Sequence, residues 1–189
     1  MARIKKFTTQ QLWEATKQLL LKGGYEAFTI SLLAESMNVS RAAVYKYYPN
    51  KEELIAQFML EKMEQTVASF SAMDATQSFD LLFKEMLGKI FDSKDLHEIL
   101  GYASKINNVS DVVIQKKEKL SNLHHEMFHT LLKVVAKGKE ENMIAQNKDD
   151  FLILSFIFST ITVQNHSSLN EEDFLFELEQ FILYGIKKK

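Results

Sequence analysis

The amino-acid sequence predicts an all-α protein, and two observations support this fold class. Apolar residues recur at the helical period along nearly the whole chain, and no segment shows the strict alternation of apolar and polar residues that is typical of a strand. Apolar residues make up 46% of the 189 residues, which is enough to form a core rather than a disordered chain. The sequence contains no cysteine, which excludes a disulfide framework and thiolate chemistry.

The first predicted helix covers residues 9–22. Thr8 precedes it as the N-cap, and Gln11 follows three residues later, which is the spacing of a capping box. Gly23 and Gly24 then predict the end of the helix, because glycine readily adopts the left-handed conformation that closes a helix.

Two short helices are predicted next, at residues 30–37 and 41–47. Thr29 and Ser40 are their N-caps. The connection between them is only three residues long and contains Asn38, a residue type that tolerates positive φ. Two short helices joined in this way indicate a helix-turn-helix, in which the second helix enters the major groove of DNA.

Six further helices follow the only proline of the chain. Pro49 ends the preceding helix, because the residue before a proline is pushed out of helical geometry. Asn50 caps the next helix, and Tyr48 is expected to pack in the core. The predicted ranges are 51–70, 79–91, 96–106, 112–137, 151–166 and 171–184, and Gly138 is expected to end the fourth of these six. The first contains neither glycine nor proline, so one continuous helix is expected to join the N-terminal head to the body.

Charge is distributed unevenly along the chain. The net charge is −2, but residues 1–55 hold eight Lys or Arg against five Asp or Glu, a balance of +3, so the remainder carries −5. This basic segment indicates a polyanionic partner at one end. Arg3, Lys5 and Lys6 could form a basic arm on DNA, or belong to a disordered N-terminus.

The compartment and the domains follow from composition and from the helix pattern. Residues 1–25 lack the features of a signal peptide, and the apolar run 151–163 is shorter than the roughly 20 residues of a membrane span, so a soluble cytoplasmic protein is expected. We predict a helix-turn-helix DNA-binding domain over residues 1–50 and a helical ligand-binding and dimerisation domain over residues 51–189.

The segment 41–47 has a composition suited to a DNA groove. Ala42 and Ala43 allow close approach and can contact thymine methyl groups, and Arg41 has the geometry to bridge O6 and N7 of a guanine. The side chains suited to phosphate oxygens are Tyr45, Lys46, Tyr47 and Lys51. The alternative is a three-helix packing unit whose polar residues are merely solvated.

The segment FTISLLAESMNVSRAAVYKYYPNKEELI, residues 28–55, resembles the DNA-binding segment of the tetracycline-repressor (TetR) family of bacterial transcription regulators. The resemblance covers about residues 8–55. The shared positions are Thr29, Ala34, Val39-Ser40, Tyr45, Tyr48, Lys51 and Glu53-Leu54. The resemblance implies that the DNA backbone is held by Thr29, Tyr45, Tyr47 and Lys51. It also implies that the residues facing the bases or nearby phosphates are Ser40, Arg41, Ala42 and Ala43.

Three positions depart from the pattern of that family. Asn38 stands where glycine is usual, Ala43 where threonine is frequent, and Tyr47 where histidine is frequent. Ala43 removes a polar group that could read a base, so base recognition is expected to depend on Arg41 and on the shape of the DNA.

A ligand cavity is expected in the body, because methionine and aromatic side chains form adaptable walls for apolar or planar ligands and because the resemblance implies an effector. For any single one of these residues, plain core packing is the alternative reading. The candidate ligand-binding residues are Met59, Met63, Phe83, Met86, Tyr102, Met127, Phe128 and Asn165.

Residues 125–129 read HEMFH, the H-E-x-x-H pattern of zinc metalloproteases. No third histidine follows at a suitable spacing, and Asp149 is the only acid considered as a third ligand. We therefore predict no cofactor, no structural or catalytic metal and no enzymatic activity. A helical zinc metalloenzyme is the alternative from another class, and a regulatory metal on His124, His125 or His129 is a further one.

The last two predicted helices carry more apolar surface than their own body can cover. The resemblance implies that they pair with their twofold mates in a four-helix bundle. Such a homodimer would set two recognition helices about 34–36 Å apart and make the operator a near-palindrome.

The function expected from all this is that of a ligand-responsive transcription repressor. A small hydrophobic or aromatic effector would release it from its operator by shifting the helix 51–70 and changing the separation of the heads. An architectural DNA-binding protein without an effector is the remaining alternative.

Overall fold

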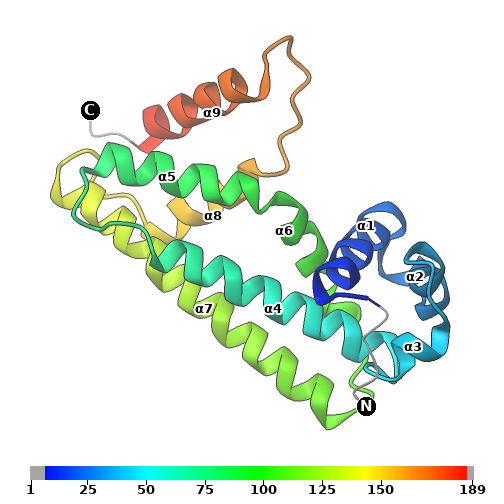
Figure 1. Ribbon diagram of the computed structural model, residues 1–189. Coiled ribbons are helices and arrows are strands. Elements are labelled where there is room, and N and C mark those ends of the chain that lie inside the picture. The colour runs from blue at the N-terminus through cyan, green and yellow to red at the C-terminus, as the bar shows by residue number, and fades with distance from the viewer. Residues whose placement is uncertain (1–6, 187–189) are drawn as a thin grey trace. The chain divides into compact units, whose positions relative to one another are not determined.

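The computed structural model describes residues 7–186, and Figure 1 shows their arrangement in helices. The helices in chain order are α1 (Thr9–Ala27), α2 (Ile30–Ser36), α3 (Arg41–Tyr45), α4 (Lys51–Ser71), α5 (Phe79–Asp92), α6 (Lys94–Leu100), the 3-10 helix η1 (Gly101–Lys105), α7 (Asp111–Glu140), α8 (Asp150–Thr160) and α9 (Glu171–Ile186). The described residues form no strand, which confirms the predicted fold class. None of these helices is long and apolar enough to span a membrane. The predicted arm of Arg3, Lys5 and Lys6 lies outside the described residues.

The chain folds into two compact units. Unit 1 combines the residues up to Gln65 with Asp95–Leu123, and unit 2 combines Thr66–Lys94 with the residues from His124 onward. Helices α4 and α7 each begin in unit 1 and end in unit 2. Unit 1 thus contains the whole predicted head and reaches beyond residue 50, while the functional division at residue 50 stays a prediction.

The core of unit 1 draws on segments that are far apart in sequence. Its buried members come from α1 to α3, from the start of α4 and from the segment 99–113, and include Leu12, Trp13, Leu20, Phe28, Leu33, Val44, Leu54, Ile55, Phe58, Ile99, Ile106 and Val113. The ring of Trp13 lies 6.0 Å from that of Tyr48 and 5.6 Å from that of Phe58. Tyr48 therefore packs against the core, as predicted from its place before Pro49.

Most helix starts lie where the capping residues predict them. Thr8 and Gln11 form a reciprocal capping box, in which the Gln11 N–H donates to the Thr8 hydroxyl at 3.0 Å and the Thr8 N–H donates to the Gln11 side chain at 2.8 Å. Asn50 accepts a hydrogen bond from the Glu53 N–H at 2.7 Å at the start of α4. Gly24 breaks the first helix with φ 69°, as expected, but one further turn follows and extends α1 to Ala27.

Two predicted helix ends are wrong. Gly138 does not end α7, because the helix continues through it to Glu140 and turns at Asn142 with φ 58°. The helix predicted over 151–166 ends at Thr160, and the following residues form an exposed loop. In that loop Asn165 and Ser167 hydrogen-bond to nearby backbone groups, an alternative to helical pairing that short polar side chains favour.

The segment predicted as one helix over 96–106 is also divided. Helix α6 ends at Leu100, and the chain continues as the 3-10 helix η1. The predicted recognition helix is shorter than expected as well, since α3 ends at Tyr45 rather than at residue 47.

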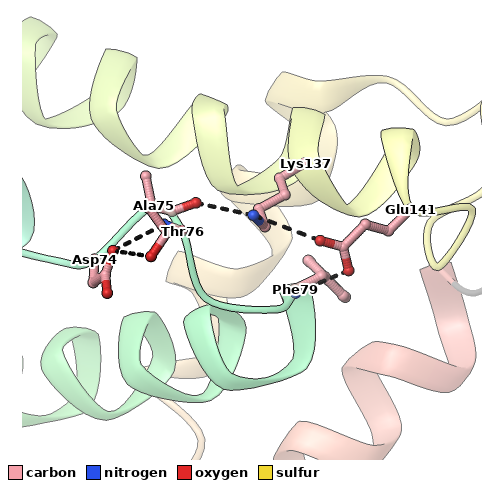
Figure 2. A network of polar contacts seen from close by, with 6 residues as sticks. All are labelled: Asp74, Ala75, Thr76, Phe79, Lys137 and Glu141. Carbon is pink, nitrogen blue, oxygen red and sulfur yellow. Dashed lines mark hydrogen bonds and ion pairs between the residues drawn. The ribbon is translucent and has the colours of Figure 1, made fainter.

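In unit 2, hydrogen bonds and an ion pair connect the α4–α5 loop and the start of α5 to the end of α7 (Figure 2). The Lys137 ammonium donates to the Ala75 carbonyl at 2.9 Å and pairs with the Glu141 carboxylate at 3.6 Å. The other oxygen of Glu141 accepts a hydrogen bond from the Phe79 N–H at 3.0 Å. Glu141 therefore satisfies one of the N–H groups that the first turn of α5 leaves without a helical partner.

Candidate DNA-binding site

Helices α2 and α3 are joined by a tight turn that fixes their relative direction. Asn38 adopts φ 53°, and the Val39 N–H donates to the Ala34 carbonyl at 2.9 Å. Leu33 and Val44 are fully buried between the helices and the core. The positive φ expected at Asn38 is thus present, and this geometry is that of a helix-turn-helix.

The turn leaves one face of α3 exposed. Arg41, Ala42 and Tyr45 are exposed to solvent whereas Val44 is buried, and the Tyr45 side chain is 49% exposed. Ala43 is half-buried and packs partly against the core. The outward face therefore combines a short methyl, a guanidinium and a phenol, with few bulky groups at its leading end.

The residues after α3 continue this exposed surface. Lys46 is exposed and Tyr47 is 42% exposed. The Tyr47 ring contacts that of Phe7 edge-on at 5.8 Å between centroids, and the Lys46 ammonium lies 5.8 Å from the Tyr47 ring centroid. Contact with Phe7 limits the positions that the Tyr47 ring can take.

The two N-cap hydroxyls differ in what they bind. Thr29 accepts a hydrogen bond from the Leu32 N–H at 3.1 Å and so caps α2 as predicted. Ser40 occupies the N-cap position of α3, but its side chain forms no capping hydrogen bond. A hydroxyl at this position that is not engaged in capping can bind another acceptor or donor, such as a phosphate oxygen.

Lys51 lies at the first position of α4 and is half-buried. Its ammonium donates to the Tyr25 carbonyl at 3.2 Å and lies 4.2 Å from the centroid of the Tyr25 ring. The Tyr25 hydroxyl donates to the Glu52 carboxylate at 3.3 Å. Burial, together with the nearby Glu52 carboxylate, raises the pKa of Tyr25 to about 12.

The predicted ligand-binding residues are divided between the two units. In unit 1, Met59 and Met63 are buried in α4 and Tyr102 is half-buried in η1. In unit 2, Phe83, Met86 and Met127 are buried, Phe128 is half-buried and Asn165 is exposed.

Two of the polar or aromatic candidates already have partners in the fold. The Asn165 side chain bonds within its own loop, where its amide donates to the Leu169 carbonyl at 2.9 Å. The Phe128 ring stacks on that of Phe158 at 5.4 Å. The assignment of all eight residues to a ligand stays a prediction.

An open cavity of about 520 Å³ lies in unit 2 between α7 and the start of α8. It is lined by His129, Leu132, Lys133, Ala136, Lys139, Lys148, Asp149, Asp150 and Phe151. None of the predicted ligand-binding residues is among them.

The HEMFH segment lies in the middle of α7 with His125 and His129 exposed. Asp149, the acid considered as a third ligand, instead caps α8 by accepting a hydrogen bond from the Leu152 N–H at 2.8 Å. Over residues 7–186 no three His, Cys, Asp or Glu side chains come close enough to hold a metal ion. The metalloenzyme alternative is therefore not favoured.

Residues 12–58 match the family model described as bacterial regulatory proteins of the tetR family. The match begins in α1 and ends in α4, so it covers both helices of the helix-turn-helix and the residues around Lys51.

Residues 12–58 therefore belong to the TetR family of bacterial regulatory proteins. The whole chain is 20% identical over 188 residues to an uncharacterised HTH-type transcriptional regulator of Haemophilus influenzae, covering 97% of this chain and 95% of that one. It is 27% identical over 146 residues to IcaR of Staphylococcus epidermidis, the HTH-type negative transcriptional regulator of the biofilm operon icaADBC, covering 74% of each.

A solved structure extends the likeness in fold to the body. The regulator FadR from Bacillus subtilis, solved in complex with stearoyl-CoA, matches with a TM-score of 0.67 and 18% identity over 95% of this chain and 100% of that chain. At this identity the likeness concerns the fold, which both units share with that structure.

Sequence reasoning missed two residues at this TetR-family head. Phe7 precedes the N-cap Thr8 and is buried, which is the position of a hydrophobic staple, so the capping box could have indicated it. Tyr25 gave no such signal. Its contact with Lys51 joins residues 26 positions apart and depends on the turn at Gly24.

Proposed function

We propose that this TetR-family regulator is a ligand-responsive repressor that binds a near-palindromic operator as a homodimer. The observation that carries the proposal is the exposed surface of α3, where Arg41, Ala42 and Tyr45 are open to solvent while Val44 is buried in the core. A helix that packs on the core through one side and exposes small side chains on another can lie in a major groove about 12 Å wide.

Each residue on this surface has a role in the proposal. Arg41 reads a guanine, and Ala42 and Ala43 permit close approach to the bases. The phosphate contacts are assigned to Thr29, Ser40, Tyr45, Lys46, Tyr47 and Lys51, because hydroxyl and ammonium groups suit phosphate oxygens.

The homodimer is proposed to form through α8 and α9. Both helices expose large apolar side chains, and Leu152 and Phe181 are 67% and 72% exposed. Phe151, Phe156, Phe176 and Tyr184 are also exposed on these helices. A concentration of exposed large apolar side chains on two helices favours a subunit interface over a solvated surface. Residues 51–189 would thus serve dimerisation and ligand binding, and residues 1–50 DNA binding.

The effector is proposed to be a small hydrophobic or aromatic molecule bound in the body. Methionine and aromatic side chains of α4, α5 and α7 supply adaptable apolar groups. FadR, which has the same fold, was solved with stearoyl-CoA, a ligand with a long apolar chain, and IcaR is a negative regulator. The stearoyl-CoA complex of FadR favours an apolar effector, and the role of IcaR favours negative control.

The effector is proposed to release the protein from DNA by shifting α4. This helix begins with Lys51 in unit 1 and ends in unit 2 without interruption by glycine or proline. An effector that binds one position of α4 more tightly than another would shift the separation of the two heads in the dimer. A coupling free energy of about 1–3 kcal/mol is typical of such systems.

Selection of bound duplexes from random DNA with the purified protein tests the proposal. We expect two half-sites related by a near-palindrome, with centres about one helical turn apart. The affinity of the selected duplex is expected to fall steeply with salt, because phosphate contacts release counterions. Recovery of no preferred sequence, or binding that ignores salt, would contradict the proposal.

A further inference from the structure

Tyr25 holds the ammonium of Lys51 through two neutral groups. The ammonium donates to the Tyr25 carbonyl at 3.2 Å and faces the Tyr25 ring at 4.2 Å from the centroid. A cation over an aromatic face is attracted by the ring quadrupole, and the attraction grows when water is excluded. Tyr25 is only 4% exposed, so the ring is a fixed surface rather than a mobile one.

The charge of Lys51 is not neutralised by this arrangement. Among the ion pairs of the described residues, none includes Lys51, although Glu52 and Glu53 follow it directly. The Glu52 carboxylate instead accepts a hydrogen bond from the Tyr25 hydroxyl. One residue thus engages the cation through its carbonyl and ring, and the neighbouring anion through its hydroxyl.

The hydroxyl of Tyr25 remains a donor throughout the ordinary pH range. Its pKa is raised to about 12, first by burial and then by the charge of Glu52. A neutral phenol keeps both its hydrogen bond to Glu52 and its attraction for a cation.

The position of Tyr25 depends on Gly24. Residue 24 has φ 69° and ψ −176°, a conformation that L side chains rarely adopt. This break in α1 changes the chain direction one residue before Tyr25, which presents its carbonyl to the start of α4.

We propose that Tyr25 is a positioning residue for DNA binding, which holds the un-neutralised ammonium of Lys51 where it meets a DNA phosphate. An ammonium has three N–H donors, and the carbonyl occupies one of them, so donors remain for phosphate oxygens. A lysine that is already ordered loses less side-chain entropy when it binds than a free one does. The inference rests on the proposed DNA-binding function.

A double-mutant cycle on the selected operator duplex tests the inference, with the variants Tyr25→Leu, Lys51→Met and their combination. We expect Tyr25→Leu to weaken DNA binding about fivefold in the wild-type background and less than about twofold when residue 51 is Met. Lys51→Met is expected to lower the slope of log affinity against log salt by about two, one for each subunit of the proposed dimer, whereas Tyr25→Leu leaves the slope unchanged because the charge remains. Equal effects of Tyr25→Leu in both backgrounds would overturn the inference.

Fluorinated phenylalanines at position 25 separate the electrostatic role from packing. They keep the shape of the ring while weakening and then reversing its attraction for a cation. Phenylalanine at position 25 is the reference of the series, and successive fluorination is expected to weaken DNA binding in steps relative to it. This series stays informative if Tyr25→Leu fails to fold. If the DNA affinity did not change with fluorination, the proposal would be wrong.

The failure of this inference can be told from failure of the proposed function. If the wild-type protein binds no DNA selectively, the proposed function itself is wrong. If it binds selectively and Lys51→Met has no effect, or if the Tyr25 variants act independently of Lys51, only the positioning role is wrong.

Discussion

Gly138 lies directly against the ring of Phe79. A Cβ atom at residue 138 would be 2.6 Å from Cε2 of Phe79 and 2.7 Å from Cδ1 of Ile144, closer than real Cβ contacts come. Phe79 and Ile144 are both fully buried, so neither side chain is free to move aside. The glycine therefore lets α7 pack closely against the start of α5 without ending the helix.

Gly138→Ala is expected to destabilise the fold. Alanine gains about 1 kcal/mol of helix propensity over glycine, but overpacking a filled core costs about 1–3 kcal/mol. Chemical denaturation should show a net loss of stability. Gly88→Ala in α5 is the matched control, because a Cβ there meets nothing within 4 Å, and it should leave stability unchanged or raise it. Equal effects of the two variants would contradict the packing role of Gly138.

Glu141→Ala is expected to lower the free energy of unfolding by about 1 kcal/mol, because α5 loses the acceptor for the Phe79 N–H. Glu141→Gln keeps an acceptor and loses the charge that faces Lys137, so a smaller loss is expected. The exposed neighbour Glu140→Ala is the control for a change of charge alone. Urea titration compares the three variants. If Glu141→Gln lowered the free energy of unfolding as much as Glu141→Ala does, the effect would belong to the ion pair with Lys137 instead.

Arg41→Ala is expected to weaken operator binding by about 1–3 kcal/mol and to relax base preference at one position of each half-site. Lys46→Ala should instead weaken binding to all sequences alike and lower the salt slope by about two, one for each subunit of the proposed dimer. Binding measurements on duplexes with single base changes, at several salt concentrations, separate these outcomes. A variant at Arg41 with unchanged base preference would remove it from the role of base reader.

Phe181→Asp and Leu152→Asp are expected to shift the protein from dimer to monomer, because each would place a charge in the proposed interface. The matched control is Leu81→Asp, since Leu81 is 58% exposed on α5, outside the last two helices. Sedimentation equilibrium at micromolar concentration measures the change. A wild-type monomer under these conditions, or dissociation by Leu81→Asp alone, would refute an interface on α8 and α9.

The sequence predicted those features whose causes are local. Helix starts at Thr8, Thr29 and Asn50 follow from side chains that bond to the backbone three residues away, and the structure confirms all three. The exposed residues of α3 were predicted from their residue types and from the family resemblance rather than from helical period, because Arg41 lies three residues before the buried Val44 and so on nearly the same side of the helix.

Features that depend on distant contacts escaped prediction. Gly138 carries the usual signal of a helix end, and only the presence of Phe79 explains why the helix continues. The contact of Tyr25 with Lys51 likewise leaves no pattern in the sequence, because it depends on the turn at Gly24 and on the packing of α1 beside α4. The assignment of a ligand cavity from methionine and aromatic residues stays a prediction, because these residue types also serve as ordinary core.

The core of unit 1 limits the design of chimeras in which the DNA-binding head of one relative is joined to the body of another. A chimera joined after residue 50 would receive Leu12, Trp13 and Val44 from one parent, and other residues of the same core, including Phe58 and Ile106, from the other. A gene fusion that exchanges DNA specificity between relatives must therefore take two separate segments from the same parent. These are the residues up to Gln65 and Asp95–Leu123.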